Sequence, residues 1–172
     1  MTLLARLLAI FALSANVAAC GTSRQAAPQP PDCVVGLVVD GDTFRCRDGR
    51  RVRLIGVDSP EQQQHPHGAR SRQALLHLLP VGAAVRLEHD VSPRDRYGRE
   101  LAYVWIGATL VNEAMVRDGW AVLYTVPPNV KYAGRLERAQ DEARARGAGL
   151  WAGRGFDCQP VDYRRGRCLS PP

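Results

Sequence analysis

The 172-residue sequence contains only one lysine, Lys131, although it has 23 basic residues against 17 acidic ones. The other basic residues are arginines, whose planar guanidinium group suits bidentate recognition of phosphate. The formal net charge of +6 favours an anionic partner such as nucleic acid or lipid headgroups. Apolar residues make up 45% and charged residues 23% of the chain, which excludes wholesale disorder and a collagen-like structure. No internal repeat is present, and the length predicts one domain with terminal additions.

The apolar segment at the N-terminus is too short for a stable membrane span. Residues 1–20 have an early cation, an apolar stretch and small residues before Cys20, a pattern typical of a secretory signal peptide. Residues 17–21 also resemble the bacterial lipobox, in which the cysteine becomes the lipidated first residue. We therefore expect a lipoprotein signal peptide over residues 1–19, a membrane anchor on Cys20 and an extracytoplasmic location. Cleavage after Ala19 with plain secretion is the alternative.

Closely spaced metal-binding pairs are absent, since the sequence has neither a CxxC nor an HxxxH motif to support a zinc site. Apart from Cys20, four cysteines remain: Cys33, Cys46, Cys158 and Cys168. Disulfides persist in the oxidising compartment that an exported protein reaches. Four cysteines allow three connectivities, and we favour the two local pairs, the first with the second and the third with the fourth.

Short β-branched and apolar segments separated by turns follow from Cys33 onwards. They predict five strands, at residues 33–40, 43–47, 51–58, 83–90 and 100–106. Helical spacing and stop signals predict three helices, at residues 69–80, 111–119 and 132–146. Five short strands with interspersed helices indicate a mainly β, α+β domain built on a small barrel, of which the OB-fold is a five-stranded example.

The segments on either side of this domain differ from it in composition. Residues 20–32 are small, polar and Pro-rich, which predicts a flexible tether. The domain itself is expected over residues 33–152, followed by a cysteine-containing extension over residues 153–172 with little secondary structure. Three arginines toward the end of this extension could add phosphate contacts, but we favour solvation of a disulfide-closed loop. These three are Arg164, Arg165 and Arg167.

Four acidic residues are predicted to gather at one end of the first hairpin. If the Asp-Gly dipeptide at positions 48–49 forms the turn, Asp42 and Asp58 lie near the same end of the hairpin. Asp40 and Glu61 then lie just beyond that end. Hard oxygen ligands of this kind suit Ca²⁺ or Mg²⁺. The alternative is a local turn stabilised by Asx hydrogen bonds.

Two arginines accompany these acids. Arg53 lies within an apolar strand, where an unpaired charge is costly. Arg99 follows a Tyr-Gly turn and directly precedes the strand at residues 100–106. Phosphodiester cleavage gathers negative charge in its transition state, which fixed guanidinium groups and a carboxylate-bound cation stabilise. A carboxylate such as Glu61 could activate the attacking water.

Four motifs in this region are VVDGDTF (38–44), VRLIGVDSPE (52–61), DRYGRELAYVW (95–105) and VNEAMVRDGWA (111–121). In this order they resemble the staphylococcal nuclease, or thermonuclease, family, and the resemblance covers roughly residues 33–151. It implies an OB-fold barrel carrying three helices. It also implies Ca²⁺-dependent cleavage of DNA and RNA to 3′-phosphate ends.

The resemblance assigns the acidic residues by matching position. Asp42 and Asp58 match the carboxylate ligands of Ca²⁺. Ser59, where the family often has threonine, would contribute its backbone carbonyl, and Asp40 would support the metal from behind these ligands. Glu61 matches the general base or water-orienting acid of the family.

The resemblance also assigns residues that contact the substrate. Arg53 and Arg99 match the two phosphate-contacting arginines. Arg96 and Tyr97 match the loop that holds a terminal phosphate, where the staphylococcal enzyme has lysine before the tyrosine. Tyr124 matches one of the two tyrosines that flank the base-binding pocket, whereas a valine stands near the position of the other. The resemblance therefore does not predict which bases this chain prefers.

The sequence thus predicts a secreted or lipid-anchored, Ca²⁺-dependent endonuclease that acts on DNA and RNA with little sequence specificity. We expect it to be a monomer. The alternative is a catalytically silent envelope lipoprotein that binds nucleic acid through the same type of domain. The presence of Asp42, Arg53, Asp58, Glu61 and Arg99 favours the enzyme, because a silent domain need not keep all five.

Overall fold

The computed structural model describes residues 32–168. The predictions for the signal peptide, for Cys20 and for most of the tether therefore lie outside the described residues.

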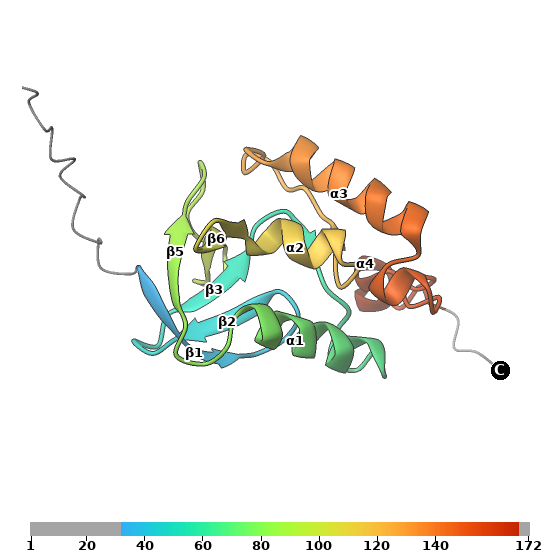
Figure 1. Cartoon of the computed structure of the whole chain (residues 1–172), viewed down its shortest axis with the longest axis horizontal. Coiled ribbons are helices and arrows are strands. Elements are labelled where there is room, and N and C mark those ends of the chain that lie inside the picture. The colour runs from blue at the N-terminus through green and yellow to red at the C-terminus, as the bar shows by residue number, and fades with distance from the viewer. Residues whose placement is uncertain (1–31, 169–172) are drawn as a thin grey trace, which may run out of the picture.

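Figure 1 shows short strands gathered on one side of the molecule and the longer helices on the other. In chain order the elements are β1 (Cys33–Val38), β2 (Thr43–Cys46), β3 (Arg51–Leu54), β4 (Val57–Asp58), α1 (His67–Leu78), β5 (Ala84–Glu88), β6 (Glu100–Ile106), β7 (Thr109–Leu110), α2 (Val111–Arg117), β8 (Val122–Leu123), α3 (Ala133–Arg146), a 3₁₀ turn η1 (Gly149–Trp151) and α4 (Pro160–Arg164).

Five strands close the barrel. The strands β1, β2 and β3 form an antiparallel meander, and β5 pairs with both β1 and β6. Parallel pairing of β3 with β6 completes the ring. Alternation along β3 buries Val52 and Leu54 inside the barrel and leaves Arg51 exposed, as the two-residue period of a strand requires. The predicted five-stranded, OB-fold-like barrel of mixed class is confirmed.

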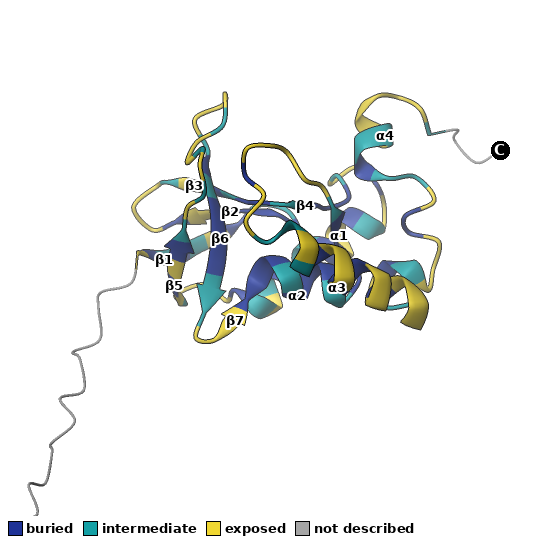
Figure 2. Cartoon of the chain, turned by 90° about the horizontal axis from the view of Figure 1, so that it is seen from above, coloured by how far each residue is buried: buried dark blue, intermediate teal, exposed yellow. Residues whose placement is uncertain are grey.

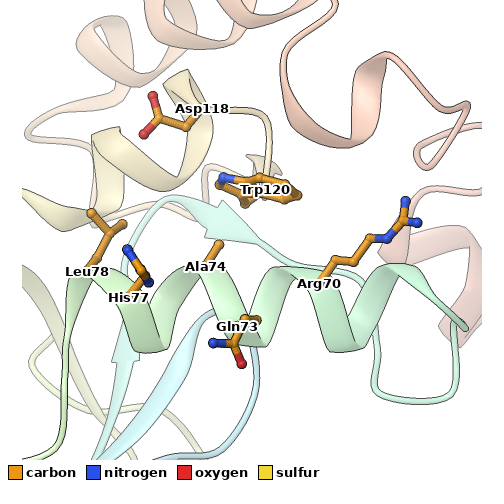
Figure 3. Close-up of a pocket in the computed structure, with 7 residues that line it drawn as sticks. All are labelled: Arg70, Gln73, Ala74, His77, Leu78, Asp118 and Trp120. Carbon is orange, nitrogen blue, oxygen red and sulfur yellow. The ribbon is translucent and has the colours of Figure 1, made fainter.

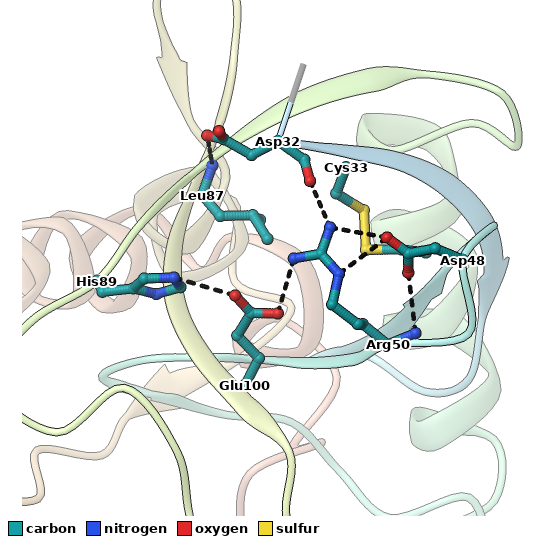
Figure 4. The surroundings of a disulfide bond; sticks show 8 residues. Asp32, Cys33, Asp48, Arg50, Leu87, His89 and Glu100 are labelled. Carbon is teal, nitrogen blue, oxygen red and sulfur yellow. Dashed lines mark hydrogen bonds and ion pairs between the residues drawn. A yellow bond between two sulfur atoms is a disulfide. The ribbon is translucent and has the colours of Figure 1, made fainter. Parts of the chain in front are cut away.

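The first hairpin turns at Asp48 and Gly49, as the sequence predicts. Gly49 has φ +91°, a conformation that side chains rarely adopt, and Asp48 accepts a hydrogen bond from the backbone N–H of Arg50. The disulfide Cys33–Cys46 joins β1 to β2 beside this turn, where Arg50 also links the hairpin to β6 (Figure 4). The second predicted pair, Cys158–Cys168, is also bonded. Both local pairings are therefore confirmed.

Three helices cover one side of the barrel, and α2 lies between α1 and α3 (Figure 1). Most of α2 is buried, whereas the outer face of α3 is exposed (Figure 2). The buried face of α3 consists of Leu136, Ala139 and Ala143, which recur at helical spacing. The helix predicted at residues 69–80 forms two residues earlier, as α1.

A buried asparagine fixes α2 to the barrel. The Nδ2 of Asn112 donates to the carbonyl oxygens of Ile55 at 2.8 Å and Ala102 at 3.2 Å, and its Oδ1 accepts from the backbone N–H of Val104 at 2.8 Å. A buried amide left unpaired is costly, so a fully bonded one favours a single docking position for the helix. Helix α2 therefore holds β6 and the chain before β4 in register.

The described part of the C-terminal extension is attached to the domain. Phe156 packs with Val122 and Leu150 in a buried cluster, and the ring centroids of Trp151 and Phe156 are 4.6 Å apart. Little secondary structure was predicted here, and the structure adds the short helix α4, which is too brief to produce a helical period in the sequence. None of the helices within residues 32–168 has the length and apolar character needed to cross a membrane.

Candidate active site

The two central carboxylates come from the same end of the β2–β3 hairpin, as predicted. Thr43 lies opposite Arg53 in this hairpin, so Asp42, just before β2, lies beside the chain that continues from β3 into β4. Asp42 and Asp58 are 6% and 1% exposed. Arg53 bridges them, with its Nε 3.0 Å from Asp42 Oδ1 and its Nη2 3.3 Å from Asp58 Oδ1. The hairpin therefore brings two buried acids and one arginine together.

The carboxylate of Asp42 is held in its charged form. Its Oδ2 accepts hydrogen bonds from both the backbone N–H and the hydroxyl of Ser59, each at 2.8 Å. Burial by itself would raise the pKa of Asp42, but the charge of Arg53 and the two bonds from Ser59 outweigh it and lower this pKa. Arg53 is fixed in turn, because its Nη1 donates to the carbonyl oxygens of Leu54 and Val57 at 2.7 and 2.8 Å.

Asp40 and Asp42 belong to the loop at residues 39–42 between β1 and β2, here called the acidic loop, against which α1 packs. The Oδ1 of Asp40 accepts a hydrogen bond from the backbone N–H of Asp42 at 3.0 Å. Burial, together with the charge of Asp42, raises the pKa of Asp40 to about 7. Between the two acids, a Cβ on Gly41 would collide with the side chain of Ser71 in α1 and lie 2.7 Å from the Cβ of Ser59. Only glycine allows this close approach.

Glu61 lies in a fixed loop that leads into α1. Its backbone N–H donates to Gln64 Oε1 at 2.8 Å, and its carbonyl accepts from the backbone N–H of Gln64 at 2.9 Å. Gly68 of α1 faces the same carbonyl so closely that a Cβ there would overlap it. The loop is thus held from two sides, while the side chain of Glu61 remains 35% exposed.

A second arginine completes the acidic cluster, and it comes from the C-terminal extension. Arg164 Nη1 donates to Asp58 Oδ1 at 3.0 Å and to Glu61 Oε1 at 2.7 Å, and its Nη2 donates to Asp58 Oδ2 at 2.8 Å. Burial raises the pKa of Asp58, although the hydrogen bonds from Arg164 and the charge of Arg53 oppose this shift. The interpretation of Arg164 as a solvated tail residue was wrong. No local pattern signals a contact between residues 106 positions apart.

The predicted phosphate-binding loop lies on the other wall. Arg99 Nε is 2.6 Å from Asp95 Oδ2, and Tyr97 OH accepts a hydrogen bond from Arg96 at 2.6 Å. The guanidinium carbons of Arg96 and Arg99 lie 4.8 and 5.7 Å from the centroid of the Tyr97 ring. Tyr97 and Tyr124 are 66% and 39% exposed, so both rings can be reached from solvent.

One cavity of about 450 Å³ collects every predicted site residue within the described part of the chain. These ten residues are Asp40, Asp42, Arg53, Asp58, Ser59, Glu61, Arg96, Tyr97, Arg99 and Tyr124. Two further residues line the same cavity, Pro60 and Arg164, and Arg164 is the charged one that was not predicted to lie there. An adjoining hollow of about 390 Å³ shares Arg53, Tyr97 and Tyr124 with it and extends the site into a cleft.

A separate hollow of about 380 Å³ lies between α1 and the turn after α2 (Figure 3). Trp120 and Ala74 form part of its apolar wall, and His77 and Arg70 lie along α1. Asp118 is the only carboxylate among its lining residues. It therefore lacks the paired acids and arginines of the cavity described above.

Comparison with known proteins identifies the family. Residues 51–153 match the family model described as "Staphylococcal nuclease homologue". The chain belongs to this family. The thermonuclease of Staphylococcus intermedius is 42% identical over 127 residues, which cover 69% of this chain and 74% of that protein. The thermonuclease of Staphylococcus hyicus is 38% identical over 123 residues, which cover 67% and 72%.

Similarity to another relative extends beyond the family model. An uncharacterized endonuclease of Haemophilus influenzae is 32% identical over 167 residues, which cover 95% of this chain and 84% of that protein. A match of that length includes part of the extension at residues 153–172. The similarity to this relative is therefore not confined to the residues that the family model matches.

The donor set of this nuclease homologue fits a hard divalent cation bound by few side chains. Asp42 and Asp58 offer buried carboxylate oxygens, which Ca²⁺ prefers. Together with Glu61 and Arg53, they carry a formal charge of minus two, from three carboxylates and one guanidinium group. Within residues 32–168, no three His, Cys, Asp or Glu side chains are arranged to enclose a metal ion. A cation here would need backbone carbonyl or water ligands as well.

Proposed function

We propose that this protein is a Ca²⁺-dependent endonuclease that hydrolyses phosphodiester bonds of DNA and RNA with little sequence specificity. The names of its relatives, thermonuclease and endonuclease, support nuclease activity. The observation that carries the proposal is the single cavity in which Asp42, Asp58 and Glu61 face Arg53 and Arg99. This arrangement combines a cation site, a proton acceptor and two phosphate ligands.

The two arginines bind the phosphate that is cleaved. Arg53 is only 13% exposed and is anchored to backbone carbonyls, so its donors are fixed before the reaction. Arg99 contacts Asp95 through Nε, which leaves the outer edge of its guanidinium group for a phosphate oxygen. Fixed donors of this kind stabilise the charge that develops in the transition state better than water does.

Glu61 accepts the proton of the attacking water, and its partly exposed carboxylate can reach solvent for this purpose. Asp42 and Asp58 would hold the cation together with the backbone carbonyl of Ser59, and Asp40 would support them from behind. When bound there, Ca²⁺ supplies positive charge to a phosphate oxygen. Cleavage that leaves a 3′-phosphate agrees with the family resemblance.

The exposed rim of the cleft binds the remainder of the substrate. Arg96 and Tyr97 hold a terminal phosphate, and Tyr124 offers an aromatic face to one base. Stacking on an aromatic ring tolerates every base, because each base has a π-face. Such a rim gives little sequence specificity.

Incubation of the purified protein with plasmid and with single-stranded DNA tests the proposal. We expect cleavage of both with Ca²⁺ and none with a chelator. The alternative is the silent nucleic-acid-binding lipoprotein, which would retard DNA in a gel and leave it uncut under both conditions. That result would refute the proposed nuclease activity and favour the nucleic-acid-binding protein.

We further propose that residues 1–19 are removed as a signal peptide and that Cys20 carries a lipid anchor outside the cytoplasm. The sequence pattern supports this location, as do two disulfides, which persist in oxidising compartments. Residues 20–32 then tether a monomeric domain to the membrane. We expect Cys20→Ser to move nuclease activity from the membrane fraction to the soluble extracytoplasmic fraction. Wild-type activity that is already soluble would contradict the anchor and favour plain secretion.

A further inference from the structure

The C-terminal extension contacts the proposed catalytic cavity through Arg164 and the loop of Glu61 through Cys158. Arg164, the last residue of α4, forms ion pairs with Asp58 and Glu61. Separately, Gln64 Nε2 donates to the carbonyl oxygen of Cys158 at 3.1 Å, and the same Gln64 side chain accepts the backbone N–H of Glu61. The extension is therefore joined both to a proposed cation ligand and to the loop of the proposed base.

We propose that Arg164 is a further positioning residue of this site, which holds Asp58 and Glu61 while no divalent cation is bound and leaves Asp58 when one binds. This inference rests on the proposed function, because that function assigns the cation to Asp58. It gives the extension a role in the reaction cycle of the nuclease.

Both carboxylate oxygens of Asp58 accept hydrogen bonds from arginines in the structure. Oδ2 accepts from Arg164 at 2.8 Å, and Oδ1 accepts from Arg164 at 3.0 Å and from Arg53 at 3.3 Å. Calcium binds oxygen ligands at roughly 2.3–2.6 Å. A cation at that distance would lie against a guanidinium group bound to the same oxygen atoms, and the two positive charges repel each other. Arg164 and the cation therefore compete for Asp58.

The charges of the cluster favour the same exchange. Asp42, Asp58 and Glu61 together with Arg53 carry a formal charge of minus two, which a divalent cation balances. If Arg164 stayed in place at Asp58, its positive charge would lie directly beside that of the cation. Without the cation, Arg164 lowers the repulsion among the three acids.

Arg164, and not Arg53, is the arginine that can leave. Arg53 is 13% exposed and donates to the backbone carbonyls of Leu54 and Val57, contacts that it would lose on moving. Arg164 is 39% exposed, and its side-chain bonds within residues 32–168 go only to Asp58 and Glu61. Its release into solvent breaks nothing else in the described structure.

Calorimetric titration of the purified protein with Ca²⁺ tests the exchange. Arg164→Gln removes the competing charge, and we expect Ca²⁺ to bind about threefold to tenfold more tightly, the range expected when the charge removed belongs to a partly exposed arginine that solvent screens. Arg164→Lys keeps the charge but loses the bidentate fork, so an intermediate affinity is expected. Arg165→Gln is the matched control, since Arg165 follows Arg164 and forms no ion pair within the described residues.

Thermal unfolding in chelator gives a second readout that does not depend on activity. The Arg164→Gln variant should unfold at a lower temperature than wild type, because Asp58 and Glu61 lose their counter-ion. The difference should vanish at saturating Ca²⁺. In an Asp58→Asn background, Arg164→Gln should have little further effect on Ca²⁺ affinity, since the shared ligand is gone.

The possible results separate this inference from the proposed function. Equal Ca²⁺ affinities of wild type and Arg164→Gln, with cation-dependent plasmid cleavage intact, overturn the inference alone. Equal tightening in Arg164→Gln and Arg165→Gln also overturns it, because net charge would then suffice as the cause. A wild-type protein that neither binds Ca²⁺ nor needs it for cleavage overturns both.

Discussion

Replacement of Gly41 by alanine tests whether contact between α1 and the acidic loop forms the site. The added Cβ would collide with the side chain of Ser71, which is fully buried and donates a hydrogen bond to the carbonyl oxygen of Trp120 at 2.7 Å. It would also lie 2.7 Å from the Cβ of Ser59. Neither neighbour is the free end of a flexible side chain, so α1 or the loop must shift.

The expected cost is that of overpacking a core, about 1–3 kcal/mol of unfolding free energy. For a domain of this size, each kcal/mol corresponds to a fall in Tm of about 2–4 °C. The shift also moves Asp42, whose carboxylate depends on Ser59 for two hydrogen bonds. A misplacement of about 1 Å can lower a catalytic rate about 100-fold, so activity should fall more than stability predicts.

Urea unfolding and a DNA-cleavage rate measured on the same preparation check both effects. Gly134→Ala in α3 is the matched control, because the nearest atom to its added Cβ outside the backbone of its own helix is Arg138 Nη1, at 3.8 Å. Alanine favours a helix over glycine, so this control should stabilise the protein by no more than about 1 kcal/mol. If the Gly41→Ala variant keeps the urea midpoint and the cleavage rate of the wild type, the close approach of α1 to the acidic loop is refuted.

Three further predictions concern the acids and the disulfides. Glu61→Gln removes the proton acceptor and should lower the cleavage rate by about 10²–10⁴-fold with nucleotide binding retained; an unchanged rate would remove Glu61 from the mechanism. The folded chain keeps a proton on Asp40 up to pH about 7, which the unfolded chain releases near pH 4. In chelator, the unfolding free energy should therefore fall between these pH values by at most about 1.4 kcal/mol per pH unit. Urea titrations at pH 5 and pH 8 measure this fall in the unfolding free energy. Asp40→Asn should remove the part of the fall that Asp40 causes, and an unchanged fall in the variant would contradict the raised pKa of Asp40. Loss of Cys33–Cys46, which joins two barrel strands, should cost about 2–4 kcal/mol. Loss of Cys158–Cys168 should cost less and leave cleavage intact at saturating Ca²⁺, because it closes a segment outside the barrel; equal costs would show that the extension and the barrel unfold as one unit.

The strands and the acidic cluster could be predicted because local patterns determine them. The Asp48-Gly49 turn sets the hairpin register, which pairs Thr43 with Arg53 and so places Asp42 at the end of the hairpin from which the chain runs on to Asp58. The family motifs supplied the residues of the opposite wall, Arg96 and Tyr97, which no short-range argument connects to the hairpin. Periodicity located α1 to within two residues at each end.

The role of Arg164 could not be predicted by the same means. Its contact with Asp58 joins residues 106 positions apart, and it depends on how Phe156 and α4 are attached to the domain. The extension has no family motif, and its five-residue helix has no measurable period. The neighbouring arginines Arg164, Arg165 and Arg167 look alike in the sequence, and only the tertiary fold distinguishes Arg164 from Arg165.

The position of Arg164 also bears on how the site forms before any cation binds. Three carboxylates held together repel one another, and burial of Asp42 and Asp58 increases that cost. Arg53 comes from the barrel itself and offsets only part of the charge. Arg164 supplies a second cation from outside the barrel, so the acids can take up their positions without Ca²⁺. In many small metal sites, by contrast, the free energy of metal binding also drives folding. Here the Ca²⁺ affinity would be set by the exchange of one counter-ion for another on a site that is already folded.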